Sequence, residues 1–172
     1  MSSPYNSYAI TSVKKALNAL KTILEKAEAH AKEKSIALDD LFNARLYEDM
    51  RPLSFQIWAA TSNAEKVVFR PRHLEPPARE QTDQTFEDLY KRIDVSLGEI
   101  ANVDVADIVA NEDKPFKAPL GPKEIEFKPV GYAVEFALPN VFFHVVTAYN
   151  ILRKEGVPLG KMDYLKNFLE LY

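Results

Sequence analysis

Residues 138–163, LPNVFFHVVTAYNILRKEGVPLGKMD, decide the fold of this chain. Pro139 suits the first position of a helix, because its missing N–H would have no hydrogen-bond partner there. Gly156 suits the residue just past the helix end, and Pro158 prevents the helix from continuing. Between these positions apolar residues occupy almost every side of the helix, which is typical of a helix in a protein core.

One side of this predicted core helix is nevertheless polar. At 100° per residue, Asn140, His144 and Thr147 fall on the same face. Polar groups inside a core need a hydrogen-bond partner, a ligand or water. This polar stripe is therefore the first candidate for a functional site.

Three further long helices follow from apolar residues at helical spacing. The first covers roughly residues 7–34 and has an apolar stripe over nearly three heptads. The second begins at Pro52 and ends near Arg70, before the next proline. The third opens at Thr85, which can form a capping box with Asp88.

Two segments interrupt the helical pattern. Residues 71–83, PRHLEPPAREQTD, contain three prolines and predict a loop. Residues 111–131 are broken by proline and glycine, and Ile125 and Phe127 alternate with charged residues, which favours a short strand or extended arm. Residues 132–137 fit either a strand or a helical lead-in.

Three blocks of sequence carry a family resemblance: LFNARLYEDMRPLSFQI (residues 41–57), GYAVEFAL (131–138) and PNVFFHVVTAYNILRKEGVPLGKMD (139–163). In this order they resemble an uncharacterised family of the DinB/YfiT-like superfamily. The resemblance implies an all-α fold, an up-down-down-up four-helix bundle with short extra helices and a small extended or β-like insertion before the last bundle helix. We expect a single domain over residues 1–172.

The resemblance also implies a metal site, and here the sequence departs from it. Superfamily members often use one histidine from the second helix and a His-x-x-x-His pair from the last. His144 matches the second member of that pair, but Asn140 stands at the first, and the second long helix has no histidine. Asparagine is a poor zinc or nickel ligand, and no spacing supports Asp49 or Glu135 as substitutes. We therefore predict no metal and no cofactor.

His144 has three interpretations. It is a satisfied core residue bonded to Asn140 or Gln56, a residue that orients a small ligand, or a general base, for which an ordinary pKa near 6.5 is suitable. We name His144 as the candidate general base. The candidate binding residues are Asn140, Thr147, Gln56, Asn63 and Asp49.

Composition excludes several function classes. The chain has 172 residues, a net charge of −3 and no sustained Lys/Arg cluster, which argues against nucleic-acid binding. It has no cysteine, so disulfides, thiolate metal sites and cysteine nucleophiles are excluded. No apolar run approaches the roughly 20 residues that span a bilayer, and no secretory signal is present, so we expect a cytoplasmic protein without a membrane partner.

The first functional hypothesis is a bundle with a degenerate metal site that binds a small organic molecule, with metal-free acid–base or isomerising chemistry in addition. The alternatives are a structural or interaction protein with a closed core, and a metal-dependent thiol transferase with substituted ligands. Polar-stripe residues that face one cavity favour a binder, whereas pairing with each other or with backbone favours the closed core. We also predict a homodimer through helix faces, because the first helix has apolar surface for both the core and a neighbour.

Overall fold

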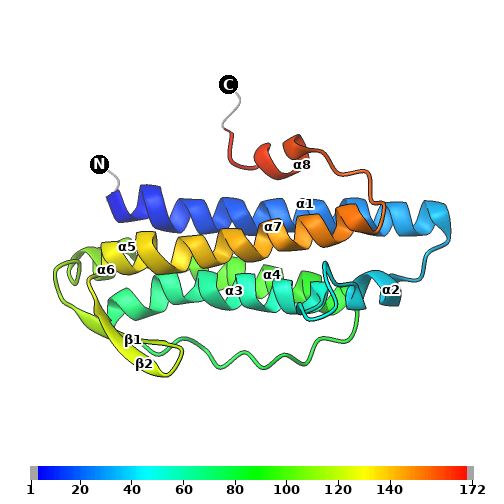
Figure 1. Ribbon diagram of the computed structural model, residues 1–172. Helices are drawn as coiled ribbons and strands as arrows, with labels where there is room; N and C mark the ends of the chain where they lie inside the picture. The colour runs from blue at the N-terminus through cyan, green and yellow to red at the C-terminus, as the bar shows by residue number, and fades with distance from the viewer. Residues whose placement is uncertain (1–3, 170–172) are drawn as a thin grey trace.

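Four helices of 16 to 24 residues make up most of the molecule: α1 (Thr11–Lys34), α3 (Leu53–Phe69), α4 (Phe86–Ala101) and α7 (Leu138–Lys154). The computed structural model describes residues 4–169. The four helices lie side by side; α1 and α7 run in one direction, and α3 and α4 run in the other (Figure 1). Their apolar faces meet in one hydrophobic cluster. The prediction of a mostly helical chain is therefore confirmed.

The remaining elements are short. The helical ones are η1 (Asn6–Ile10), α2 (Leu38–Asn43), η2 (Arg70–Arg72), α5 (Val105–Val109), α6 (Pro129–Gly131), η3 (Tyr132–Ala137) and α8 (Lys161–Leu165). The strands are β1 (Phe116–Leu120) and β2 (Lys123–Phe127), which pair antiparallel with Phe116 opposite Phe127. Gly121 makes the turn between them at φ 59°, a conformation that glycine adopts without strain. The predicted β-like insertion before the last long helix is confirmed.

The ends of the helices follow local sequence rules. At the start of α4, the Asp88 N–H donates to Thr85 Oγ1 at 3.2 Å and the Thr85 N–H donates to Asp88 Oδ2 at 3.1 Å, as the predicted capping box requires. After α7, Gly156 has φ 88° and ends the helix where the sequence predicts.

The predicted helix start at Pro139 is confirmed for α7, which begins at Leu138. Residues 132–137 form the helical lead-in that was one of their two interpretations, but the prediction missed how much longer the helical run is. The helical run begins ten residues earlier, at Pro129, and passes through α6 and the π-helical η3 before α7. Proline lacks an N–H, and its ring crowds the carbonyl four residues before it in an α-helix. The wider π turns directly before Pro139 accommodate both features.

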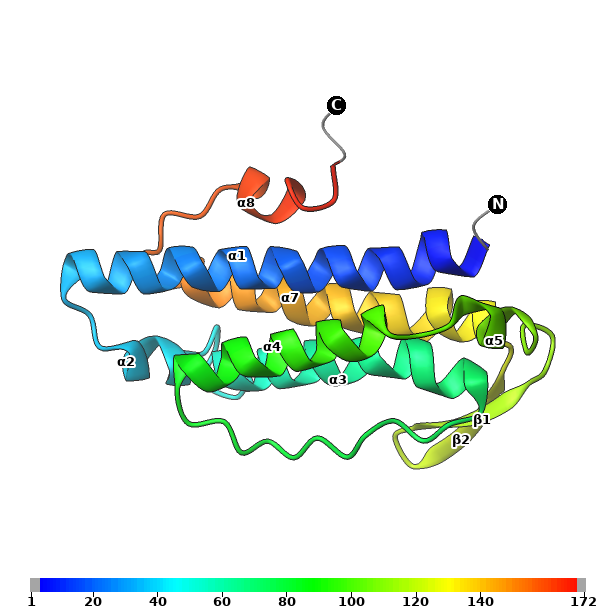
Figure 2. The same cartoon turned by 180° about the vertical axis from the view of Figure 1, so that it is seen from behind.

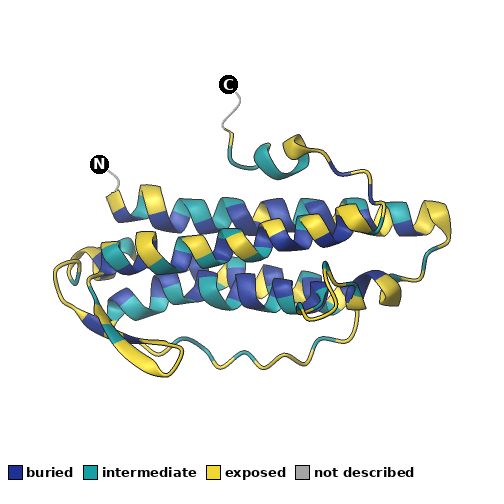
Figure 3. Cartoon of the chain, in the orientation of Figure 1, coloured by how far each residue is buried: buried dark blue, intermediate teal, exposed yellow. Residues whose placement is uncertain are grey.

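This longer helix changes one expectation about membranes. Residues Pro129–Lys154 are long and apolar enough to span a bilayer by length and composition, which the sequence analysis missed because it did not extend the helix back to Pro129. The helix packs against α1 and α3, and core helices of packed bundles pass the same test. Parts of its surface are nevertheless exposed (Figure 3).

A long connection joins α3 to α4. Residues 74–84, which we call the strap, run back along the bundle from the end of α3 to the start of α4, so that these two helices are parallel (Figure 2). The strap has no helix or strand of its own, in agreement with the predicted loop.

Candidate functional site

The predicted polar stripe lies where α3 packs against α7, and we call this line of contact the seam. Gln56 of α3 is buried, and His144 of α7 is half-buried beside it. The His144 Nδ1 atom lies 2.8 Å from Gln56 Oε1. The structure thus contains one of the two pairings that the sequence predicted for His144.

The Gln56 side chain determines which ring nitrogen of His144 carries the proton. Gln56 Nε2 donates to the Arg51 backbone carbonyl at 3.0 Å, so Oε1 must be the atom that faces the imidazole. Because Oε1 can only accept, Nδ1 carries the hydrogen and Nε2 keeps a free lone pair. Within residues 4–169, Nε2 has no partner, and it is not among the buried unpaired atoms, so it reaches solvent.

The surroundings of His144 keep it neutral. Burial is the main cause, and the charge of Lys66 adds to it, so the pKa of His144 falls from 6.5 to about 4. The rings of Phe55 and Phe143 approach the imidazole edge-on, with centroids 6.0 and 5.3 Å away. At pH 7 the exposed Nε2 is therefore a hydrogen-bond acceptor and a weak base.

The other residues of the stripe are paired within their own helices. The side chains of Asn140, Thr147 and Asn63 each donate to the backbone carbonyl four residues earlier, at 2.7, 2.7 and 2.9 Å. Thr147 is buried, whereas Asn63 and Asn140 are half-buried. Asp49 is exposed in the turn before α3 and forms no bond with the seam residues. Of the six predicted residues, only His144 and Gln56 therefore contact each other.

Two cations of the seam were missed by the sequence analysis. Lys66 Nζ donates to Asn63 Oδ1 at 3.2 Å, and an Arg70 N–H donates to the Tyr132 hydroxyl at 3.2 Å. Both side chains are half-buried, Lys66 on α3 and Arg70 at the start of η2. Burial lowers the pKa of Lys66, and the charge of Arg70 lowers it further, while the Glu65 carboxylate offsets part of this effect. Their positions 10 and 14 residues after Gln56 place them near one helix face, which is the signal that could have found them.

Comparisons with known proteins agree with this fold. The model of a domain of unknown function, DUF1993, matches residues 5–165. This chain belongs to the DUF1993 family. It is also similar to a DinB family member from Shewanella denitrificans, whose crystal structure was solved at 1.83 Å. That likeness has a TM-score of 0.84 and 32% identity, and it covers 94% of this chain and 90% of that chain. No protein of curated description matches. The resemblance to the DinB-like superfamily is confirmed.

The three-histidine site expected from the superfamily does not fit this DUF1993 chain. His144 is the one imidazole at the seam, and Asn140 donates its amide to backbone. Across the described residues, no group of three or more His, Cys, Asp or Glu side chains could hold a metal ion. We therefore derive no metal-dependent chemistry for the seam, and the transferase alternative has no ligand set.

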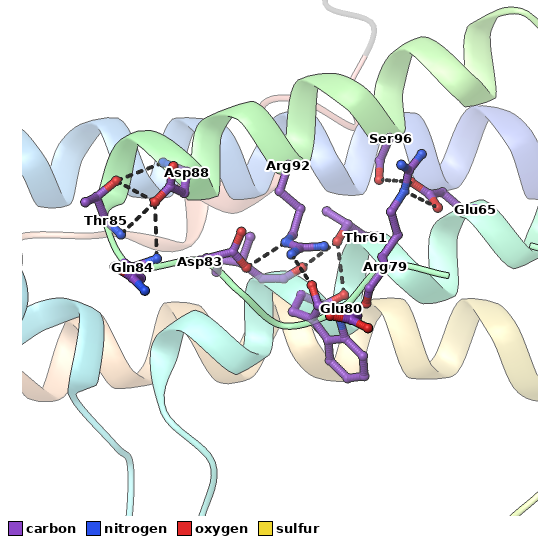
Figure 4. A network of polar contacts seen from close by, with 12 residues as sticks. Thr61, Glu65, Arg79, Glu80, Asp83, Gln84, Thr85, Asp88, Arg92 and Ser96 are labelled. Atoms are coloured by element: carbon purple, nitrogen blue, oxygen red, sulfur yellow. Dashed lines mark hydrogen bonds and ion pairs between the residues drawn. The ribbon is translucent and has the colours of Figure 1, made fainter. Parts of the chain in front are cut away.

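A second polar cluster lies on the other side of α3, beneath the strap (Figure 4). Glu65 is 1% exposed there, and its carboxylate accepts from Ser96 Oγ at 2.6 Å and from Arg79 Nε at 3.3 Å. The Arg79 guanidinium also donates to Glu99 at 3.2 Å. Glu65 and Arg79 line a cavity of about 390 Å³ between the strap and α4.

Further bonds attach the strap to both helices. Trp58 Nε1 donates to the Arg79 backbone carbonyl, and Arg92 Nε donates to Asp83 at 2.7 Å. A second Arg92 nitrogen donates to the Glu80 carbonyl at 2.7 Å. The polar groups that hold the strap are thus bonded to one another. These bonds hold the strap against α3 and α4.

Proposed function

We propose that this protein binds a small organic molecule at the seam between α3 and α7 without a metal ion. In this interpretation the scaffold is an up-down-down-up four-helix bundle with a degenerate metal site. The observation that carries the proposal is the chain of bonds from the Arg51 carbonyl through Gln56 to His144, which orients the imidazole with Nε2 toward solvent.

The bonding chemistry favours a ligand with a hydrogen-bond donor and an apolar part. A neutral Nε2 accepts a hydrogen bond from an O–H or N–H group. The rings of Phe55 and Phe143 beside the imidazole offer apolar surface, and 59% of Phe143 is exposed. In functional histidines, the ring nitrogen that does not contact the ligand commonly forms an orienting hydrogen bond, as Nδ1 of His144 does with Gln56.

The role of His144 as a general base stays a prediction. A base works best when its pKa lies near the working pH, and a pKa of about 4 makes His144 a weak proton acceptor at neutral pH. Binding is therefore the main part of the proposal. Acid–base or isomerising chemistry requires that a bound substrate raise the pKa of His144.

A titration with phenol tests the proposal, with the histidine ring signals followed by NMR. Phenol has one O–H donor and one apolar ring. We expect phenol to shift the His144 ring signals and to leave those of His30 and His73 in place, since these two lie outside the seam. Followed by the backbone amide signals of α3 and α7, the His144→Gln variant should bind phenol more weakly, whereas the control His73→Gln should bind it as the wild type does. Equal shifts of all three rings, or none, would refute the proposal.

A closed core is the second candidate, and one observation favours it. Asn63, Asn140 and Thr147 satisfy their donors within their own helices, as a purely structural stripe would do. If this candidate is correct, the seam functions only in packing, and neutral probes such as phenol will not shift the His144 ring signals. The same titration therefore separates the two candidates.

A further inference from the structure

Lys66 and Arg70 carry half-buried positive charges one helical turn apart. The chain carries a net charge of −3, yet within residues 4–169 neither side chain forms an ion pair. Both are half-buried. A cation taken partly out of water is destabilising unless it gains a charged partner. Two such cations, one turn apart at the end of α3 and the start of η2, therefore create a place for an anion.

A hydroxyl group of α3 has no hydrogen-bond partner in the same stretch of the described chain. Ser62 Oγ is buried, and it has no hydrogen bond within the described part of the chain. A serine inside a helix commonly bonds the carbonyl four residues earlier, but Ser62 does not. Ser62 lies one turn before Lys66, so the two side chains are neighbours on the helix surface. A ligand oxygen that bonds this buried hydroxyl would remove the penalty of leaving it unpaired.

Lys66 and His144 are placed to contact one molecule. Side chains on an α-helix lean toward its N-terminus, and the bond from Lys66 Nζ to Asn63 shows that Lys66 leans this way. This direction is toward His144, whose pKa the Lys66 charge already lowers.

We propose that the seam binds an organic monocarboxylate. Lys66 and Ser62 contact the carboxylate, Arg70 adds positive charge one turn further along, and the apolar part of the ligand lies against Phe55 and Phe143. This inference rests on the proposed function and adds the chemical class of the ligand. A lysine and an arginine thereby supply the positive charge that other members of the superfamily obtain from a metal ion.

The test compares benzoate with its neutral analogue benzamide. Amide NMR titrations are run at fixed ionic strength, because salt screens the charge interaction. We expect benzoate to shift the amide signals of residues 62–70 and the ring signals of His144, and benzamide to bind more weakly. Lys66→Met keeps the aliphatic stem and removes the charge, so it should weaken benzoate binding about tenfold or more.

Two further variants serve as controls. Arg70→Gln should also weaken benzoate binding, so the test does not depend on one substitution. Lys91→Met removes an exposed lysine of α4 that pairs with Glu87, and it should leave benzoate binding unchanged. Equal binding of benzoate and benzamide, or full binding to Lys66→Met, would overturn the inference. Inorganic phosphate that binds at Lys66 while benzoate does not would also overturn it.

These outcomes separate the inference from the proposed function. If phenol shifts His144 while benzoate shows no advantage over benzamide, the seam binds small molecules but has no carboxylate preference. If benzoate shifts residues 62–70 while neither compound reaches His144, the anion site exists and the proposed role of His144 is wrong.

Discussion

If the charge of Lys66 serves ligand binding, this charge should lower the free energy of unfolding of the protein without ligand. Because burial lowers its pKa and it has no acidic partner in the described chain, replacing it with methionine removes a desolvated charge and keeps the packing of the stem. We expect Lys66→Met to raise the free energy of unfolding by about 1 kcal/mol. Urea unfolding at pH 7 measures this change. A loss of stability instead would show that the ammonium group holds the seam together.

The low pKa of His144 predicts a pH dependence of stability. Between pH 4 and 6.5 the unfolded chain binds a proton at His144 that the folded protein does not, so stability rises with pH across this range. The full contribution is present above pH 6.5 and is lost as the pH falls toward 4. The difference in pKa corresponds to at most about 3 kcal/mol, which solvent at Nε2 reduces to roughly 1–2 kcal/mol.

The His144→Gln variant isolates this effect. We expect the stability of the wild type relative to the variant to fall by that amount between neutral pH and pH 4, as measured by urea unfolding. A relative stability that stays constant with pH would mean that His144 titrates alike in the folded and unfolded chains.

Alanine variants of His144 and Asn140 should differ in stability, because His144 bonds a residue of another helix and Asn140 bonds its own helix. His144→Ala leaves the buried Gln56 oxygen without its partner and should reduce stability by about 1–3 kcal/mol. Asn140→Ala removes only a bond within one helix turn and gains helix propensity, so its effect should be below about 1 kcal/mol. Denaturant unfolding of both variants measures this. Large losses in both would favour the closed core.

At the residue scale, the sequence named Gln56 as one of two possible partners of His144, but it did not reveal the half-buried cation and the buried hydroxyl nearby. Helical spacing places Asn140, His144 and Thr147 on one face, and Gln56 was named as a partner of His144. Spacing does not show which polar groups lack a partner, because that depends on neighbours from other helices. Lys66 and Ser62 were therefore missed.

At the scale of elements, the strap offers the clearest prediction. Arg79→Met removes the guanidinium from the buried Glu65 carboxylate and leaves it only the Ser96 hydroxyl. An unpaired buried charge is strongly unfavourable, so we expect a loss of about 2–4 kcal/mol in unfolding free energy and faster proteolysis within residues 74–84.

The double variant Glu65→Gln with Arg79→Met provides the control. Its neutral amide no longer needs a cation, so it should recover part of the lost stability. A single Arg79→Met variant as stable as the wild type would show that Arg79 contributes nothing to fastening the strap.

The elements themselves were largely predictable because their signals are local. The Thr85 capping box and the Gly156 helix end involve residues that are neighbours in sequence. The start of the helical run at Pro129 was not predictable from such rules. Pro139 is a sound helix-start signal, and only the π turns of η3 allow the helix to continue through it.

At the scale of the whole molecule, the predicted homodimer must form through a surface other than α1, the helix that the sequence suggested. The apolar stripe of α1 is fully buried in its own core, as Leu17, Leu20 and Leu24 show at 0% exposure, so α1 has no apolar face left for a neighbour. The helical run from Pro129 to Lys154 has an exposed apolar face, because only 33% of its most apolar stretch is buried.

Two residues four apart mark this surface: Val130 and Val134 are 53% and 55% exposed. Apolar side chains that gather along one helix are typical of an interface between proteins. In a two-fold dimer the same patch meets its own copy, and a stable interface covers about 800 Å² on each partner. We therefore expect two copies of the helix to pack against each other along this line.

Val134→Glu tests this arrangement. Burying two glutamates near the symmetry axis would disfavour association, so we expect light scattering to give twice the chain mass for the wild type and the single chain mass for the variant. Val95→Glu is the matched control, since Val95 is 48% exposed on α4, outside this helix, and its variant should stay dimeric. A wild type that has the monomer mass over a wide concentration range would contradict the dimer, and a dimeric Val134→Glu variant would place the interface elsewhere.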